Sequence, residues 1–417
     1  MKLALFFGKT ATQFLASVRP LALLTALLLA PWGRLSAQAQ ALPSFTYAGV
    51  CGEGTVGFGN GLRIAQNVQD TAGNSYVTGC FLNRATFGTF LLQSPGYSMF
   101  VTKLDPAGVV MWAVRADGTT EGQGIAVDAG GNVFVTGGFE GVAAFGSFVL
   151  TSRSNNAYSG NAFVAKLSPT GTFLWAVRGG GNSDGSGSGI VIDAAGNSYV
   201  CGTFRAIFNT ADFGQFSLTS NNNSKDLFIA KISPLGTFLW AIGGGGSMED
   251  YAGGITLDAT GSVYIAGAYM GIGQFGTINL TNAGDYDVVV AKLDPAGNFQ
   301  WAAGGGGSPP DIGQRIAVDA LGIVHVVGYT MSARPVFGAI TLSHPNQATF
   351  NAIVATLTPA GTWQWVVQGG GPGDDYAYDL ALDAVGNTYA VGSCSYRATF
   401  GNTVLTTAGD QDVMVSK

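Results

Sequence analysis

The residues that could do chemistry in this chain are acids in glycine-rich links. Runs such as G-G-G-G-S-M-E-D, from Gly243, place one carboxylate shortly before a buried-looking segment. A ring of such carboxylates could bind Ca²⁺, a cationic group or sugar hydroxyls. The alternative is structural, because Gly permits a tight crossover and Asp caps a turn. We favour the structural role, since each acid falls in a different repeat. The candidate acids are Glu121, Asp184, Asp250, Asp311 and Asp375.

A second set of acids recurs in the motif D-x-x-G-N, which suits a tight turn between two strands. The Asp can bond its own backbone and the Gly can take φ > 0. We therefore expect a structural role for this Asp. It begins at Asp70, Asp128, Asp193, Asp258, Asp319 and Asp383, and in two of these six copies Ser262 and Ile323 replace the Asn.

The chain contains few histidines and cysteines that could take part in catalysis or bind a metal. Only His325 and His344 are present, neither with a motif such as G-x-S-x-G, so we expect no catalytic triad and no histidine metal site. The glycine runs lack the G-K-[ST] of a phosphate loop. Four cysteines, which could form disulfides in an exported chain or remain plain buried residues, are Cys51, Cys80, Cys201 and Cys394. We expect no enzyme and no cofactor.

Composition limits the class of protein. Only 11% of the 417 residues are charged and 64 are Gly, a mixture that suits short strands and tight turns. Residues 1–39 have the pattern of a signal peptide: a basic leader, the apolar stretch LALLTALLLA, and an A-x-A site at Ala37 to Ala39. A membrane anchor is the alternative, but ten apolar residues are too few for a span. Removing this segment deletes four basic residues and no acid, which changes the net charge from −6 to −10. So acidic a chain is a poor partner for nucleic acid.

These residues are positioned by an internal repeat with a period of about 63 residues. Each unit contains four short segments rich in Val, Ile and aromatics, typified by residues 124–128, 132–137, 162–167 and 172–177. A segment F-G-x-x-x-L-T-S between the second and third is expected to be an excursion or a short edge strand. The fourth segment carries a Trp expected in the core, at Trp112, Trp175, Trp240, Trp301 and Trp365.

A repeated four-stranded antiparallel sheet predicts an all-β fold, the β-propeller, because one sheet cannot bury both of its faces alone. We expect a single domain at residues 40–417. Ser44 to Gly49 matches a fourth strand and Asp412 to Lys417 a third strand, so pairing of the two would close six blades. The alternative is a truncated chain with seven or more blades.

The combination D-A-x-G-N-x-Y-V-x-G with F-V-A-K-L-x-P-x-G-x-x-x-W resembles the SBBP repeat, a bacterial β-propeller repeat of secreted and cell-surface proteins. The resemblance covers about Ser44 to Lys417. It implies a propeller fold and an exported location, and it brings no catalytic residues. The family name refers to seven blades, whereas six units are counted here.

We expect a secreted, monomeric binding module that takes a glycan, peptide or protein on loops of one face. The alternatives are a structural or adhesive envelope protein and, less favoured, a glycoside hydrolase or lyase. Variable loops rich in Asn, Ser and Tyr are where binding usually resides on a rigid scaffold. They are Arg153 to Asn161, Asn221 to Asp226, Ala283 to Asp287 and Ser343 to Asn351.

Overall fold

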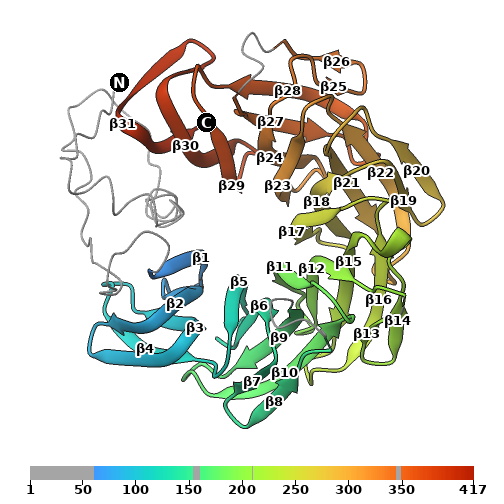
Figure 1. Ribbon diagram of the computed structural model, residues 1–417. Helices are drawn as coiled ribbons and strands as arrows, with labels where there is room; N and C mark the ends of the chain where they lie inside the picture. The colour runs from blue at the N-terminus through green and yellow to red at the C-terminus, as the bar shows by residue number, and fades with distance from the viewer. Residues whose placement is uncertain (1–60, 154–159, 209, 344–348) are drawn as a thin grey trace.

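The computed structural model describes residues 61–417 apart from 154–159, 209 and 344–348. Its described part consists of β-strands and a single short 3₁₀ turn, η1 (Asn221–Asn223). The strands form six antiparallel sheets arranged as blades around a central axis (Figure 1). The predicted β-propeller is therefore confirmed.

Blades 1 to 3 each contain four consecutive blade strands, of which the first lies nearest the axis (Figure 1). Blade 1 is β1 (Arg63–Gln69), β2 (Ser75–Phe87), β3 (Phe90–Leu104) and β4 (Val110–Arg115). Blade 2 is β5 (Thr120–Val127), β6 (Val133–Phe139), β9 (Asn161–Leu167) and β10 (Phe173–Gly180). Blade 3 is β11 (Ser186–Ile192), β12 (Ser198–Arg205), β15 (Lys225–Ile232) and β16 (Phe238–Gly244).

Blades 4 and 5 repeat this order, and the described part of blade 6 has three strands. Blade 4 is β17 (Tyr251–Leu257), β18 (Val263–Tyr269), β21 (Asp287–Leu293) and β22 (Phe299–Gly305). Blade 5 is β23 (Asp311–Val318), β24 (Val324–Thr330), β27 (Asn351–Leu357) and β28 (Trp363–Gly369). Blade 6 is β29 (Tyr376–Leu382), β30 (Thr388–Phe400) and β31 (Thr403–Ser416). The expected closing strand at Ser44 to Gly49, like the leader at 1–39, lies outside the described residues.

The segment F-G-x-x-x-L-T-S, expected to be an excursion or a short edge strand, is an excursion. It forms a hairpin of two short strands, so each blade still ends on the face where the next begins. The hairpins are β7 (Val142–Phe145) with β8 (Phe148–Thr151), β13 (Ala211–Phe213) with β14 (Phe216–Leu218), β19 (Ile272–Phe275) with β20 (Ile278–Thr281), and β25 (Val336–Phe337) with β26 (Ile340–Thr341). In blades 1 and 6 the same hairpin is continuous with long strands, β2–β3 and β30–β31.

Each excursion hairpin packs on the outermost strand of the preceding blade. Gly179 at the end of β10 pairs with Phe213 of β13, and a Cβ atom at Gly179 would overlap the Phe213 ring. Gly305 and Phe337 repeat this contact between blades 4 and 5. The G-G-G runs therefore make room for the Phe of the next unit as well as permitting a crossover.

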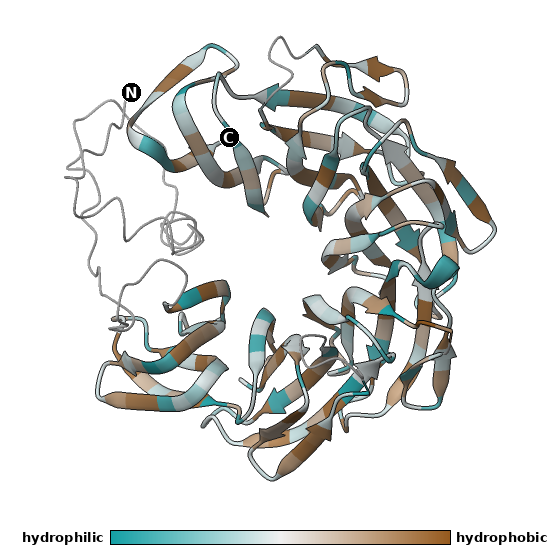
Figure 2. Ribbon diagram, viewed as in Figure 1, coloured by the Kyte–Doolittle hydropathy of each residue, from teal (hydrophilic) through white to brown (hydrophobic). Residues whose placement is uncertain are grey.

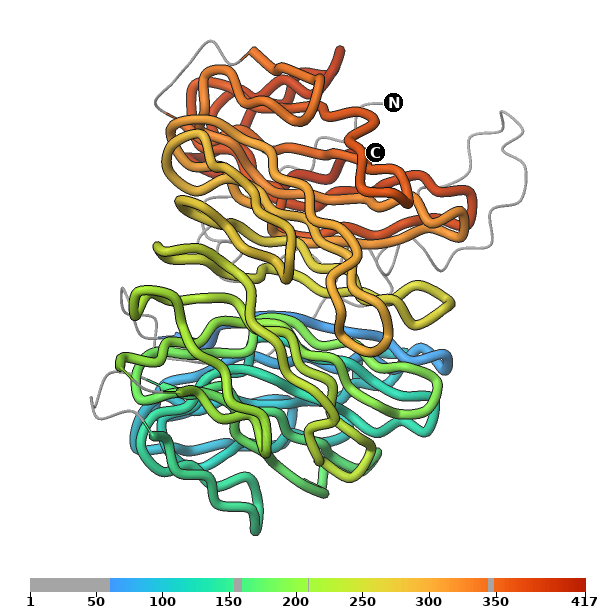
Figure 3. Tube along the Cα trace, turned by 90° about the vertical axis from the view of Figure 1, so that its right-hand side faces the viewer, coloured from blue at the N-terminus to red at the C-terminus, as the bar shows by residue number. Residues whose placement is uncertain are grey.

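The hydrophobic core lies between blades, as the repeat requires. One cluster joins Tyr199 and Ile229 of blade 3 to Val263, Ile265 and Val289 of blade 4, all nearly inaccessible. Hydrophobic segments (brown) run through the strands of every blade (Figure 2). In the view turned by 90°, the strands run from one face of the ring to the other (Figure 3). Tight turns therefore occupy one face and the links the other.

Candidate functional site

The turn face is built from repeated Asp–Tyr–Lys clusters. Asp193 Oδ1 accepts hydrogen bonds from the main-chain N–H groups of Ala195 and Asn197, at 3.0 and 2.9 Å. Its Oδ2 accepts the Tyr199 hydroxyl at 3.2 Å and lies 3.9 Å from Lys231 Nζ. Burial alone would raise the pKa of Asp193, but these hydrogen bonds and the lysine lower it. Because both oxygens of this carboxylate accept hydrogen bonds within the hairpin, Asp193 stabilises the turn. This contact pattern agrees with the expected structural role of the D-x-x-G-N aspartate.

In blade 5 the equivalent cluster contains different residues, and one of the two histidines belongs to it. His325 occupies the position of the tyrosine, with Nε2 3.6 Å from Asp319 and Nδ1 2.7 Å from the Thr388 hydroxyl. The lysine of this blade is replaced by Thr356, which is buried. Burial lowers the pKa of His325. His325 therefore holds the hairpin of its blade, and His344 lies outside the described residues.

Neighbouring blades are joined through the repeated tryptophans. Trp175 Nε1 of β10 donates to the carbonyl of Pro234 in blade 3, at 3.0 Å. Three further bonds of this kind join neighbouring blades: Trp112 to Pro169, Trp240 to Pro295, and Trp301 to Pro359. Trp365 is 41% exposed, and no proline carbonyl among the described residues accepts its Nε1.

The described cysteines are structural. Cys80, Cys201 and Cys394 are buried thiols that form no disulfide with one another, and burial raises the pKa of each. Cys51 lies outside the described residues.

The five candidate acids of the links do not converge. Glu121 lies 3.4 Å from Arg63 and Asp184 lies 3.8 Å from Lys225, each as an ion pair within its own surroundings. Over the described ranges, no group of three or more His, Cys, Asp or Glu side chains is arranged to hold a metal ion. The remaining three acids occupy one equivalent position, five residues after a link glycine: Asp250, Asp311 and Asp375.

These three aspartates each tie a link to the second strand of the blade that follows. Asp250 Oδ2 accepts the Gly246 N–H at 2.6 Å, and its Oδ1 accepts the Met270 N–H at 2.9 Å. Asp375 makes the same pair of bonds with Gly371 and Ser395. Burial raises the pKa of Asp250 to about 7, despite these hydrogen bonds.

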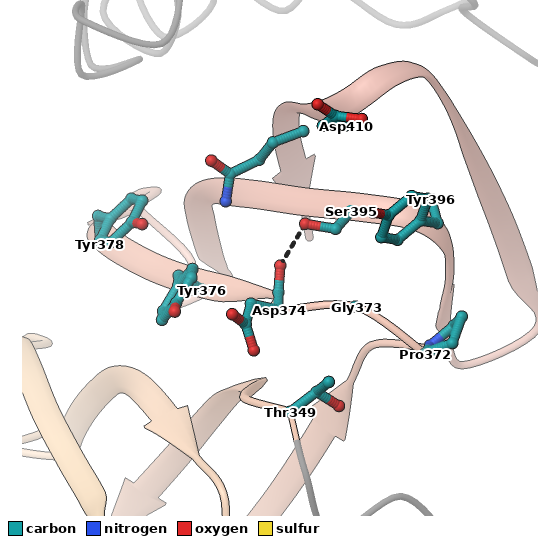
Figure 4. A pocket seen from close by; sticks show the side chains of 10 residues that line it. Thr349, Pro372, Gly373, Asp374, Tyr376, Tyr378, Ser395, Tyr396 and Asp410 are labelled. Atoms are coloured by element: carbon teal, nitrogen blue, oxygen red, sulfur yellow. Dashed lines mark hydrogen bonds between the residues drawn. The ribbon is translucent and has the colours of Figure 1, made fainter. Parts of the chain in front are cut away.

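A cleft on the link face brings together two kinds of segment that the sequence indicated separately. A link (Pro372 to Asp374) and Thr349 of the variable loop Ser343 to Asn351 meet strands β29, β30 and β31 around a volume of about 620 Å³ (Figure 4). Ser395 Oγ donates to the Asp374 carbonyl at 2.7 Å and Asp374 Oδ1 accepts the Phe350 N–H at 3.0 Å, so the link is fixed to both neighbours.

Aromatic rings form one wall of this cleft. Tyr376 and Tyr378 of β29 stack with centroids 5.5 Å apart and planes at 13°. Tyr376 also packs against Tyr329 and Phe350 of blade 5, so this wall spans two blades. Tyr396, across the cleft on β30, is 56% exposed and has a φ of 55° (Figure 4).

The polar groups of the cleft are acceptors and amides. Asp374, Asp410 and Gln411 line it with the hydroxyl groups of Thr349 and Ser395, and among the described residues no Lys, Arg or His does so. Flat rings beside carboxylate and amide groups suit a ligand with apolar faces and hydroxyl donors, and they disfavour an anion.

Sequence reasoning missed the tyrosines of this cleft. Blade 4 carries Tyr251 and Gly253 at these two positions and blade 5 carries Ile312 and Gln314, so Tyr378 is the residue in which blade 6 departs from both. The run D-D-Y-A-Y-D was therefore a detectable departure from the repeat. The repeat pattern is defined by residues that the units share, whereas this wall of the cleft depends on a residue that they do not share.

No family model matches the chain. A WD repeat-containing protein of Acanthamoeba polyphaga mimivirus, itself uncharacterized, is 25% identical over 361 residues, covering 70% of this chain. The matched part is 26% of that protein, so the chain spans about a quarter of its length.

Two solved structures are similar in outline. A protein of unknown function from Bacteroides caccae has a TM-score of 0.37 at 10% identity, covering 74% of this chain and 82% of that one. The Pan2 WD40 domain of Neurospora crassa has a TM-score of 0.37 at 8% identity, covering 80% and 86%. The strand order of the six blades, rather than these similarities, identifies the chain as a β-propeller scaffold.

Proposed function

We propose that this propeller is an exported binding module that takes a glycan in the cleft of blade 6. The cleft carries the proposal, because link, variable loop and three strands converge there on a wall of stacked tyrosines. Sugar rings present apolar C–H faces to aromatic rings and hydroxyl donors to carboxylates. The acidic balance of the chain and the absence of basic side chains among the described residues of the cleft lining disfavour anionic ligands.

The binding test compares one cleft variant with a matched control on a glycan array. Tyr396→Ala removes an exposed ring from the cleft, and Phe208→Ala removes a ring that is 91% exposed on blade 3. We expect Tyr396→Ala to lower the affinity for the bound glycan at least tenfold, and Phe208→Ala to leave it unchanged. An array with no bound glycan, or equal losses in both variants, would contradict a glycan site in this cleft.

Export is proposed from residues 1–39 and from the resemblance to secreted SBBP proteins. Expression of the whole chain in a bacterial host, followed by N-terminal sequencing of the exported material, gives a direct answer. We expect a new N-terminus at Gln40, after the A-x-A site. A product that begins at Met1 and stays in the cell would contradict export.

In the described ranges, no helix has the length and apolarity needed to cross a bilayer.

A further inference from the structure

Two buried aspartates from adjacent blades meet where the link Gly304 to Asp311 leaves blade 4. Asp287 begins β21 of blade 4, and Asp311 begins β23 of blade 5. They are 2% and 0% exposed. The Asp311 N–H donates to the Tyr286 carbonyl at 2.7 Å, so the two chain segments lie side by side.

The two carboxylates face one another across Gly306. The point where a Cβ atom of Gly306 would stand is 2.5 Å from Asp287 Oδ1 and 2.6 Å from Asp311 Oδ2. Because both distances run to the same point, the two oxygens are no farther apart than twice a calcium–oxygen bond of about 2.6 Å. One Ca²⁺ ion, displaced from that point away from the glycine, could therefore bind both.

Asp287 Oδ1 is buried and accepts no hydrogen bond of normal geometry; the nearby Gly307 N–H, which lowers the pKa of Asp287, donates to Asp311 Oδ2 at 2.6 Å. The other oxygen of the same carboxylate accepts the Ala283 N–H at 2.7 Å, so the side chain is held with Oδ1 directed toward Asp311. A buried carboxylate oxygen without a partner is costly, since it has lost its water without replacement. This oxygen indicates a partner that the protein itself does not supply.

No basic side chain compensates the two charges. Among the ion pairs of the described residues, none includes Asp287 or Asp311. The pKa of each carboxyl group is raised to about 6, chiefly by burial, and the charge of Asp311 contributes to the rise at Asp287. Two carboxyl groups this close either share a proton or bind a cation between them, and the Asp287 oxygen without a donor is placed to bind a cation.

The neighbouring blades provide a contrast. At blade 5, Asn351 Oδ1 is also buried without a donor and faces Asp375 across Gly370, but the amide carries no charge. At blade 3, the matching aspartates Asp226 and Asp250 have a hydrogen-bond donor on every oxygen. Only the pair at blade 4 combines two charges with an unpartnered oxygen among these three.

We propose that Asp287 and Asp311 bind a Ca²⁺ ion that joins the variable loop Ala283 to Asp287 to the link after blade 4. The Ser332 hydroxyl, which donates to Asp311 Oδ2 at 2.7 Å, is a neutral oxygen at the same place. Main-chain carbonyls and water complete the six to eight oxygens that Ca²⁺ takes. With two charged ligands the affinity falls at about 10⁻⁴ to 10⁻³ M, the range of weak calcium modules.

The experiment is a Ca²⁺ titration of the chelator-treated protein, followed by the melting temperature. We expect the melting temperature to rise with Ca²⁺ concentration, because an ion that binds only the folded state stabilises it. Asp287→Asn, which keeps the shape and removes a charge, weakens Ca²⁺ at least tenfold. Asp226→Asn, the equivalent change at blade 3, leaves the Ca²⁺ response unaltered.

Terbium luminescence on the unaltered protein keeps the proposal testable if Asp287→Asn does not fold. Tb³⁺ replaces Ca²⁺ at oxygen sites, and Tyr286 next to Asp287 can sensitise its emission. We expect emission that Ca²⁺ displaces and Mg²⁺ at the same concentration does not, since Mg²⁺ requires shorter bonds and keeps its water. A melting temperature that follows pH but is the same with Ca²⁺ and with chelator would show a shared proton instead, and would overturn the site.

Discussion

The indole N–H of Trp175 donates to the carbonyl of Pro234 at 3.0 Å, across the boundary between blades 2 and 3. The turn glycine that follows this proline, Gly236, lies against the same indole, and a Cβ atom there would approach it to 2.9 Å. One side chain therefore joins the outer strand of one blade to the turn of the next by a hydrogen bond and by close packing.

We expect Trp175→Ala to lower the free energy of unfolding by about 3–5 kcal/mol, because a large buried ring is lost and a cavity remains. Trp365→Ala should cost much less, since that side chain is 41% exposed and has no such proline partner among the described residues. Urea unfolding followed by circular dichroism measures both. Equal losses at the two positions would contradict a role of the Trp–Pro contact in stability.

Gly236→Ala tests the close packing. Gly236 has a φ of 84°, where a side chain costs about 1–2 kcal/mol by itself. Gly141→Ala provides the control, because Gly141 has a φ of 58° and open space around it. We expect the Gly236 variant to unfold at a clearly lower urea concentration. The excess over Gly141→Ala should largely disappear in a Trp175→Ala background, which a double-mutant cycle would show.

The pH dependence of stability follows from the buried aspartates. Burial raises the pKa of Asp250 to about 7 and that of Asp226 to about 6. A raised folded-state pKa gives a contribution that is complete below the unfolded value near 4 and is lost as pH rises through 6 to 7. We therefore expect the melting temperature to fall between pH 5 and pH 8. Asp250→Asn should flatten this fall, and an unchanged slope would contradict the assignment.

At acid pH, stability is expected to change with pH in the opposite direction. Hydrogen bonds from Asn387, opposed by slight burial, lower the pKa of Asp383 to about 2, and the same turn geometry lowers that of Asp193. Stability from a lowered pKa is present above the unfolded value and is lost as pH falls below about 4. The melting temperature should therefore decline again toward pH 2, and Asp193→Asn should reduce that decline.

Ring closure can be tested by one substitution. If the segment expected to close the ring follows the register of Ala162 with Gly179 and of Leu227 with Gly244, Cys51 is expected opposite Val413. We expect Val413→Cys to form a disulfide with Cys51 under oxidising conditions, detected by mass spectrometry of a digest. Met414→Cys is the control, because adjacent strand residues point to opposite faces. A cross-link through Met414→Cys, or none through Val413→Cys, would contradict this pairing.

Much of the fold could be predicted from the sequence because the same turn and strand patterns recur in six units. The D-x-x-G-N turn and the strand after it, for example around Asp193 and Tyr199, have direct signatures in residue type and spacing. For the F-G-x-x-x-L-T-S segment, the prediction left an excursion and an edge strand open, although the signal for a hairpin is present. Phe213 and Phe216 flank Gly214 and Gln215, a two-residue hairpin turn with Gly first and a φ of 61°.

The sites depended on contacts that the repeat does not encode. Asp287 and Asp311 lie 24 residues apart on different blades, and their encounter is set by the path of the link between them. The cleft of blade 6 depends on Tyr376 and Tyr378, and Tyr378 stands where the equivalent strands of blades 4 and 5 have Gly253 and Gln314. A periodic pattern is defined by the residues that the units have in common. Contacts made by exceptional residues are therefore recognised only from the positions of side chains in the structure.

The contacts between Phe213 and Gly179, and between Trp175 and Pro234, connect each blade only to its neighbours and in the same sense around the ring. Such a design has an evolutionary consequence. Tandem duplication or loss of a gene segment coding for one unit would preserve each of these contacts and alter only the angle between blades. Unequal recombination could thus change the number of blades, and with it the diameter of the ring, while neighbouring blades keep the same kind of interface.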